Sequence, residues 1–226
     1  MINNKIKHIF FDLDHTLWDF ETNSALTFEK IFKECQVDMA VDKFMVHYMP
    51  INHQYWKLYR ENKIEQEELR YCRLEDTFKA INFDASSKLI GTLSEQYILN
   101  LSDQTALLPY AKETLAYLND KYELHIITNG FDQIQYKKLR NSDIDDYFNT
   151  VTTAEEVTFK KPHPRVFYHA LEKAKADKKE SLMIGDSLEA DIQGAIQIGM
   201  EAIHLANGDQ SYKQSVRQLD ELKGFL

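Results

Sequence analysis

The sequence predicts an α/β fold, a doubly wound parallel sheet with an all-helical domain inserted near its start. Short apolar runs typical of buried strands recur along the chain, and stretches with helical spacing separate them. The stretch from about residue 22 to residue 102 lacks such strand-like runs and shows only helical periodicity. We therefore expect a core domain formed by residues 1–17 and 103–226 and a helical domain formed by residues 18–102.

The first strand is predicted at residues 9–11, and it runs directly into two acids, Asp12 and Asp14. Buried strands do not usually end in paired acids, because two like charges a few ångströms apart repel unless a cation or a proton lies between them. A hard divalent metal ion with oxygen ligands is the natural cation for this position. Thr16 adds a hydroxyl group two residues later.

The inserted domain is predicted to contain about four helices, from apolar residues at helical spacing such as Ile51, Tyr55, Leu58 and Tyr59. Alternation of helices and strands resumes at Pro109, a residue that suits the first turn of a helix. We expect the stretch 155–164, which contains two prolines, to be a loop.

The remaining elements follow from the same two periodicities. Strands are predicted at residues 124–128, 150–153, 182–186 and 201–205. Helices are predicted after Pro109, around the basic residues 136–140, at 165–175 and at 188–199, with a last amphipathic helix that includes Val216, Leu219 and Leu222.

Composition excludes several classes of protein. The formal net charge of −9 over 226 residues argues against a nucleic-acid partner, although a metal ion and a lysine can reverse the charge locally for a small anionic substrate. Cys35 and Cys72 are too few for a disulfide framework, which favours a reducing cytoplasm. No apolar run approaches the roughly 18 residues of a membrane helix, and the first residues show no signal-peptide pattern. We expect a cytoplasmic monomer or homodimer with no membrane partner.

Four strand ends or following loops carry polar residues that share one chemical use. In doubly wound sheets the ligand binds at the carboxyl ends of the strands, so residues from these places are expected to meet. They are Asp12 with Asp14, Thr128 with Asn129, Lys161, and Asp186.

If the substrate is a phosphate ester, each residue has a role. Asp12 is predicted to attack phosphorus and form an aspartyl-phosphate. Asp14 is predicted to protonate the departing alkoxide and then to take a proton from the hydrolytic water. Asp12, Asp186 and the backbone carbonyl of Asp14 are predicted to hold Mg²⁺.

The other residues are predicted to bind the phosphoryl oxygens or to support the site. Thr128 and the backbone N–H of Asn129 would bind those oxygens, and Lys161 would balance their charge as a catalytic and phosphate-binding residue. We prefer Lys161 to the adjacent Lys160 because Pro162 follows it. Asp191 is predicted to act on the lysine or on a metal-bound water.

These stretches resemble the four motifs of the haloacid dehalogenase superfamily, in the same order and over nearly the whole chain. The matching residues are 12–17, 127–130, 161–162 and 185–191. The resemblance implies a Rossmann-like core and a Mg²⁺-dependent enzyme with the roles given above. The inserted helices resemble the type-1 cap of that superfamily, which closes over the site and excludes water. The chain departs from the common pattern at Thr158, where glycine often stands.

A finer resemblance is to the YjjG-type pyrimidine 5′-nucleotidases, at residues 17–20, 127–131 and 155–157. It implies a soluble enzyme that dephosphorylates UMP, dUMP and dTMP. A phosphatase for sugar phosphates or other small esters, and a β-phosphoglucomutase-like phosphotransferase, stay open as alternatives. A dehalogenase is disfavoured because halide displacement needs no Asp14, and a non-catalytic sensor because all four motifs are present.

Some side chains have weaker predicted roles. Trp18, Trp56 and Arg73 are candidates for contacting the substrate, although packing is the simpler interpretation of Trp18. Lys138 and its basic neighbours are predicted to form an exposed helix face. The histidines show no metal-ligand spacing, so none is assigned to a metal.

Overall fold

The computed structural model describes residues 5–206 and 212–226 and consists of two compact units. We call them the core unit, Met1–Phe20 with Thr105–Leu226, and the helical unit, Glu21–Gln104. The sequence predicts the two junctions between residues 17 and 18 and between residues 102 and 103. In the structure they lie between residues 20 and 21 and between residues 104 and 105.

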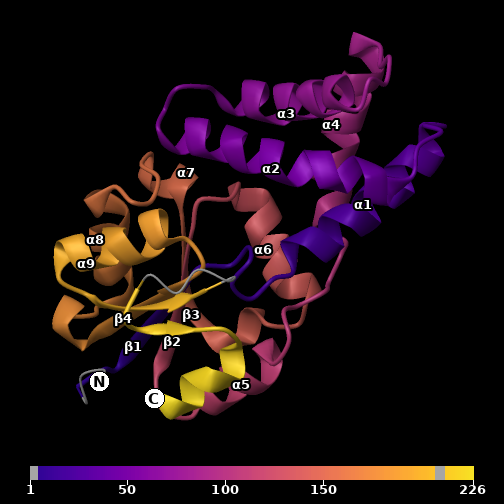
Figure 1. Ribbon diagram of the computed structural model, residues 1–226. Helices are drawn as coiled ribbons and strands as arrows, with labels where there is room; N and C mark the ends of the chain where they lie inside the picture. Colours follow the sequence, from indigo (N-terminus) through magenta and orange to yellow (C-terminus); the bar gives the residue numbers. More distant parts are fainter. Residues whose placement is uncertain (1–4, 207–211) are drawn as a thin grey trace. The chain divides into compact units, whose positions relative to one another are not determined.

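The core unit is built on a parallel sheet (Figure 1). In the described residues this sheet has six strands, in the order β3-β2-β1-β4-β5-β6. The strands are β1 (His8–Phe11), β2 (Glu123–Thr128), β3 (Phe148–Thr153), β4 (Ser181–Gly185), β5 (Glu201–Leu205) and β6 (Ser215–Val216). The central β1 pairs with β2 on one side and β4 on the other, so the strand order reverses between β1 and β4. This confirms the predicted doubly wound sheet.

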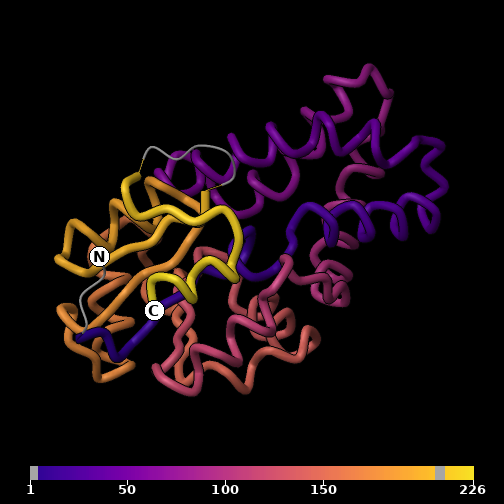
Figure 2. Tube along the Cα trace, turned by 60° about the horizontal axis from the view of Figure 1, so that its bottom comes forward, coloured from indigo at the N-terminus to yellow at the C-terminus, as the bar shows by residue number. Residues whose placement is uncertain are grey.

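Helices lie on both sides of the sheet, so every residue of β1 and β4 is buried. On one side α8 (Pro164–Ala174) and α9 (Gly194–Ile198) pack with Phe10, Ile127 and Met183 in one apolar cluster. On the other side lie α5 (Ala111–Asn119) and α6 (Asp132–Asn141) (Figure 1). Figure 2 shows that β1, in indigo, comes from the first residues of the chain yet runs beside strands from its second half.

Three elements of the core unit differ from the sequence-based expectation. Val216 belongs to β6, because its carbonyl accepts the N–H of Ala206 at 2.8 Å and ties the segment to β5. A 3₁₀-helix, Leu219–Gly224, follows, so the predicted amphipathic helix through Val216 is wrong. The predicted loop begins with a short helix, α7 (Ala154–Val157), and the predicted helix at 188–199 begins with a π-helix, Leu188–Gln193.

The helical unit contains four helices in sequence, as the periodicity predicted. They are α1 (Phe20–Glu34), α2 (Val41–Arg60), α3 (Gln66–Ala80) and α4 (Ser87–Leu101). Aromatic rings form the centre of this unit. The ring of Phe28 lies between 4.6 and 4.8 Å from those of Phe44, Tyr48 and Tyr97, centroid to centroid. These aromatic residues therefore serve helix packing.

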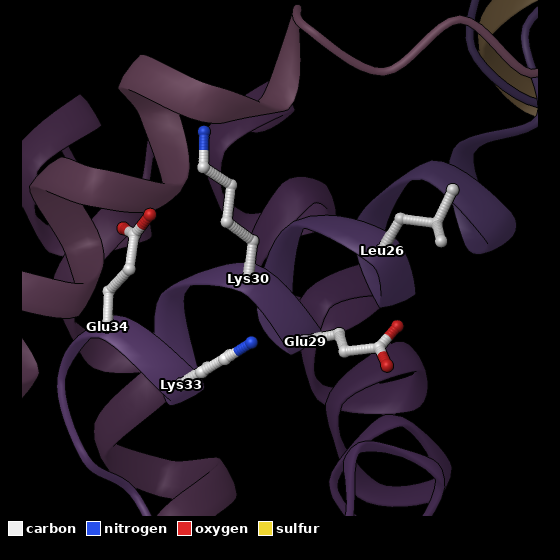
Figure 3. Close-up of a pocket in the computed structure, with 5 residues that line it drawn as sticks. All are labelled: Leu26, Glu29, Lys30, Lys33 and Glu34. Carbon is white, nitrogen blue, oxygen red and sulfur yellow. The ribbon is translucent and has the colours of Figure 1, made fainter.

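One shallow pocket lies on α1 and is lined by exposed side chains of that helix alone (Figure 3). They are Leu26, Glu29, Lys30, Lys33 and Glu34. Two lysines and two glutamates at helical spacing form an ordinary solvated face, and we assign the pocket no function. Among the described residues, no helix combines the length and the apolar character that crossing a bilayer requires.

His125, in the middle of β2, gives the core unit a specific pH dependence. Its side chain is fully buried, and burial together with the neighbouring His8 lowers the pKa of His125 to about 4. The unfolded chain takes up this proton near pH 6.5. Because the unfolded state binds the proton first, this contribution to stability is complete above pH 6.5 and is lost as the pH falls toward 4.

We expect the wild type to lose roughly 2 kcal/mol of unfolding free energy through this group between pH 7.5 and pH 5. Urea unfolding at both pH values, in buffer with EDTA, measures it as the difference from a His125→Gln variant. The variant has no imidazole at position 125, so its stability should depend less on pH by that amount. Equal pH slopes for the two proteins would contradict the interpretation.

Candidate active site

The carboxyl ends of β1, β2 and β4 bring together residues that lie far apart in the sequence. Asp12 follows β1, Asp186 follows β4, and Thr128 is the last residue of β2. Carboxylate oxygens of Asp12, Asp186 and Asp191 lie within 4.8 Å of one another. Lys161 comes from the segment between α7 and α8 and reaches the same place.

Lys161 is 1% exposed, and its ammonium lies close to three oxygen atoms. Its Nζ lies 2.6 Å from Oδ1 of Asp12, 2.7 Å from Oδ1 of Asp191 and 2.5 Å from the carbonyl oxygen of Ile127. The contacts with Asp12 and Ile127 are hydrogen bonds, and the contact with Asp191 is an ion pair. Burial alone would lower the pKa of Lys161, but the Asp12 and Asp191 carboxylates outweigh it and raise the pKa. The side chain therefore stays charged and holds one oxygen of Asp12.

The side chain of Asn129 fixes the backbone of Lys161. Its Oδ1 accepts the N–H of Lys161 at 2.7 Å, and its Nδ2 donates to the carbonyl of Lys161 at 3.0 Å. Two hydrogen bonds to one residue leave little freedom for the lysine segment. Nearby, Oγ1 of Thr128 accepts the N–H of Gly130 at 3.1 Å, which leaves its hydroxyl proton for another acceptor.

Asp186 and Asp191 are held by the turn after β4. The N–H of Asp186 donates to Oγ1 of Thr16 at 3.1 Å, and Oδ2 of Asp191 accepts the N–H of Ser187 at 3.0 Å. Gly185 is required by close approach, because a Cβ atom there would lie 2.2 Å from Oδ2 of Asp191. The chain thus brings a buried carboxylate against the backbone of β4.

Negative charge exceeds positive charge around Asp12. Burial raises the pKa of Asp12 well above its usual range, and the Asp191 and Asp186 carboxylates add to the rise against the opposing effect of Lys161. Burial, followed by Asp191, raises the pKa of Asp186 to about 7. Oxygen donors in excess of nearby cations suit a hard divalent ion. Two oxygens on opposite sides of Mg²⁺ lie about 4.2 Å apart. The carboxylate oxygens here lie within 4.8 Å of one another, so small side-chain shifts suffice for them to hold one ion.

Lys138 is a site residue that the sequence analysis missed. The expectation of an exposed position is wrong, because the side chain is 1% exposed and its Nζ lies 2.5 Å from Oδ1 of Asp14. The same ammonium lies 4.0 Å from the centre of the Trp18 ring, a cation–π contact. Asp14 is also approached by Gln135, whose Nε2 lies 3.4 Å from Oδ2.

The sequence did contain a signal for Lys138. Helix α6 buries Ile134 and Leu139 in the interior of the core unit. Lys138 follows Ile134 by four residues and therefore shares its face of the helix. Because lysine is charged, the sequence pattern predicts a solvent-exposed position for it. A buried lysine is nevertheless expected where an acid at a strand end can form an ion pair with it.

The three candidates for substrate contact have different surroundings. Trp18 is fully buried and packs on Lys138. Arg73, in the helical unit, is 2% exposed, donates to Oδ1 of Asn52 at 2.8 Å and lies 4.9 Å from the Tyr97 ring centre. It is thus an interior residue of that unit. Trp56 is half-buried, with its ring 5.7 Å from that of Tyr59.

Comparison with known proteins agrees with this geometry. The model of the family described as haloacid dehalogenase-like hydrolase matches residues 6–199. Pyrimidine 5′-nucleotidase PynA of Streptococcus pneumoniae is 33% identical, over 91% of this chain and 88% of that protein. Pyrimidine 5′-nucleotidase YjjG of Escherichia coli is 32% identical, over 85% and 82%. A glyceraldehyde 3-phosphate phosphatase of Methanothermobacter thermautotrophicus is 31% identical, over 88% and 84%.

A similar solved structure is that of the HAD-hydrolase YfnB from Bacillus subtilis bound to magnesium. The two chains superpose with a TM-score of 0.88 at 27% sequence identity, and the match covers 98% of each. The likeness therefore extends over both the sheet and the inserted helices. From the family match, the relatives and the fold together, this chain belongs to the haloacid dehalogenase-like hydrolase family.

Proposed function

We propose that this enzyme is a phosphatase that hydrolyses small phosphate monoesters through an aspartyl-phosphate on Asp12, and that its substrates are pyrimidine nucleoside 5′-monophosphates. The observation that supports this reaction is that the two acids after β1 each pair with a different lysine. Lys161 holds Asp12 and Lys138 holds Asp14. A nucleophile and a distinct acid–base group are what the two half-reactions need.

In the first half-reaction, Oδ2 of Asp12 attacks phosphorus in line, and the bond from phosphorus to the ester oxygen breaks. Lys161 holds Oδ1, so the other oxygen is the one we assign to the attack. The bonding electrons leave on the ester oxygen, and the carboxyl group of Asp14 gives that oxygen its proton. The products of this step are the free alcohol and the aspartyl-phosphate.

In the second half-reaction, water attacks the same phosphorus atom from the side that the alcohol has left. Asp14, now a carboxylate, takes the proton of this water. The bond between phosphorus and Asp12 breaks, and its electrons return to the carboxylate. Inorganic phosphate leaves, and the original protonation of Asp14 is restored.

We assign the metal to Asp12, Asp186 and the backbone carbonyl of Asp14. Both carboxylate oxygens of Asp191 already have partners, Lys161 and the N–H of Ser187, so Asp191 is assigned to orient the lysine. When bound, Mg²⁺ supplies positive charge that reduces repulsion between the attacking carboxylate and the phosphoryl oxygens. The magnesium-bound structure of the relative YfnB supports this choice of ion.

The phosphoryl oxygens are assigned to Thr128 and to the backbone N–H of Asn129. The Thr128 hydroxyl accepts a hydrogen bond from the following loop, so its proton is free to point at a substrate oxygen. The ammonium of Lys161 already lies against oxygen atoms of Asp12, Asp191 and Ile127, so it reaches a phosphoryl oxygen only by giving up one of these contacts. Its main contribution is then to fix and neutralise Asp12.

The substrate class rests on the relatives PynA and YjjG, both pyrimidine 5′-nucleotidases. The similar glyceraldehyde 3-phosphate phosphatase supports a second candidate, a phosphatase of small sugar phosphates. A β-phosphoglucomutase-like phosphotransferase would use the same two acids and stays an alternative reaction.

A panel of phosphate esters separates these possibilities. We expect kcat/KM for UMP, dUMP and dTMP to exceed that for AMP, glyceraldehyde 3-phosphate and glucose 6-phosphate by at least tenfold. Faster release from the sugar phosphates would remove the nucleotide assignment and keep the phosphatase. Conversion of glucose 1-phosphate into glucose 6-phosphate without phosphate release would indicate the phosphotransferase.

Replacement of the nucleophile should abolish turnover. In Asp12→Asn an amide stands where the carboxylate attacks, and we expect a loss of at least 10³-fold in kcat for dTMP. Asp146→Asn, at an exposed position of the same unit, is the matched control and should keep full activity. EDTA should also abolish turnover, and added Mg²⁺ should restore it. Activity of Asp12→Asn above one per cent would contradict the mechanism.

Removal of the Lys138 ammonium should affect the acid–base step selectively. In Lys138→Met we expect kcat to fall roughly 10- to 100-fold, a typical size for general acid–base effects, with a smaller change in KM.

The neighbouring Lys137 is exposed, so Lys137→Met provides the control and should behave like the wild type. Lys138→Arg should recover part of the activity because it keeps the positive charge. If Lys138→Met has a lower melting temperature but an unchanged kcat, then Lys138 is a packing residue and the assignment fails.

A further inference from the structure

A second group of metal-ligating side chains lies at the opposite end of the sheet from Asp12. His8 begins β1 and Glu123 begins β2, and the two residues are partners in the parallel register. His125 is two residues further along β2 and therefore on the same face as Glu123. One ligand atom from each of these three side chains lies within 4.8 Å of the others.

The two imidazole rings approach each other through nitrogen atoms. Nδ1 of His8 lies 3.2 Å from Nε2 of His125 and 3.7 Å from Oε2 of Glu123. On the far side of its ring, Nδ1 of His125 lies 2.9 Å from Oγ1 of Thr150. When Nδ1 donates its proton to that hydroxyl, Nε2 presents its lone pair toward His8. A carbonyl or hydroxyl acceptor fixes the tautomer of metal-binding histidines in the same way.

Two of the separations between these side chains are close to those of a tetrahedral metal site. For metal–nitrogen distances near 2.0–2.1 Å, two ligands of one tetrahedral ion lie roughly 3.3 Å apart, and the two measured separations fall on either side of this value. Two imidazoles and a carboxylate suit a borderline divalent transition-metal ion, whereas Mg²⁺ prefers oxygen ligands. The exposed side chain of Glu123 gives an ion a route to the buried nitrogen atoms.

We propose that His8, Glu123 and His125 form a second metal site, distinct from the site at Asp12, which binds a divalent transition-metal ion of the Zn²⁺ class. Three protein ligands leave a fourth position for water. The bound ion joins β1 to β2, two strands whose ligands are 117 residues apart in the sequence. Because the ion binds the folded chain, it stabilises the core unit by mass action.

The alternative is a direct N–H···N hydrogen bond between the two rings, with no ion. This alternative has a different requirement, because it needs His8 and His125 but does not need Glu123. A change confined to Glu123 therefore separates the two interpretations.

The test uses the full-length protein with millimolar Mg²⁺ present, so that the carboxylate site at Asp12 is filled. Zn²⁺ is titrated by calorimetry, and Co²⁺ is added as a spectroscopic probe of tetrahedral coordination. We expect one equivalent of Zn²⁺, visible Co²⁺ absorption of tetrahedral intensity, and a rise in melting temperature with Zn²⁺. Asp186→Asn should keep all three results, because Asp186 belongs to the other site.

Variants assign the ligands. Glu123→Gln changes an exposed side chain and should fold normally, yet its Zn²⁺ affinity should fall at least tenfold. His8→Gln and His125→Gln should lose the Co²⁺ signal. The matched control is His169→Gln, because His169 forms an exposed histidine–carboxylate pair with Glu156 at 3.1 Å. It should leave binding unchanged.

Several outcomes would overturn the proposal. Absence of Zn²⁺ binding in the presence of Mg²⁺ leaves the hydrogen-bonded pair as the correct description. If Glu123→Gln and His8→Gln bind Zn²⁺ as tightly as the wild type, the hydrogen-bonded pair is again the correct description. Equal loss in His169→Gln would show that zinc binds to surface histidines in general. If His125→Gln fails to fold, the Glu123 and His8 variants still decide.

Discussion

The buried ammonium of Lys161, between Asp12 and Asp191, is the interaction on which the rest of the core unit depends. A charge removed from water costs several kcal/mol unless its partners are close and well oriented. Here each neighbour contributes to that orientation: Asn129 fixes the backbone of the lysine, and the turn after β4 fixes Asp191. The result is a carboxylate at Asp12 that is shielded from water and points one oxygen in a set direction.

The two acids after β1 acquire different properties because their surroundings differ. Asp12 is almost fully enclosed among charged groups, while the side chain of Asp14 keeps 23% of its surface exposed and pairs with a lysine from a different helix. In the proposed mechanism, identical side chains thus serve as nucleophile and as acid–base group, since environment rather than residue type decides the role. Because the two acids need different surroundings, each pairs with its own lysine, Asp12 with Lys161 and Asp14 with Lys138.

The strands along the chain, and the polar residues at their ends or in the following loops, were predictable from the sequence because both are local signals. Apolar runs and the residues that end them mark β1, β2 and β4 directly. Other features depend on which strands become neighbours and in what register. His8 and His125 show no metal-ligand spacing along the chain, and the contact between Lys138 and Asp14 requires the placement of α6. β6 has two residues, too short for any periodicity, and Arg73 could not be assigned to an interior before the four helices were packed.

The sheet has its first strand at its centre, and this has a consequence for how the protein is made. Asp12 and Lys161 are 149 residues apart in the sequence, and Thr16 and Asp186 are 170 apart. A ribosome adding about 5–20 residues per second releases the helices of residues 21–104 well before any of these partners exists. Those helices make local contacts and fold early, whereas β1 remains without neighbours until most of the chain has emerged. A translation product that ends before Lys161 therefore carries no assembled catalytic centre.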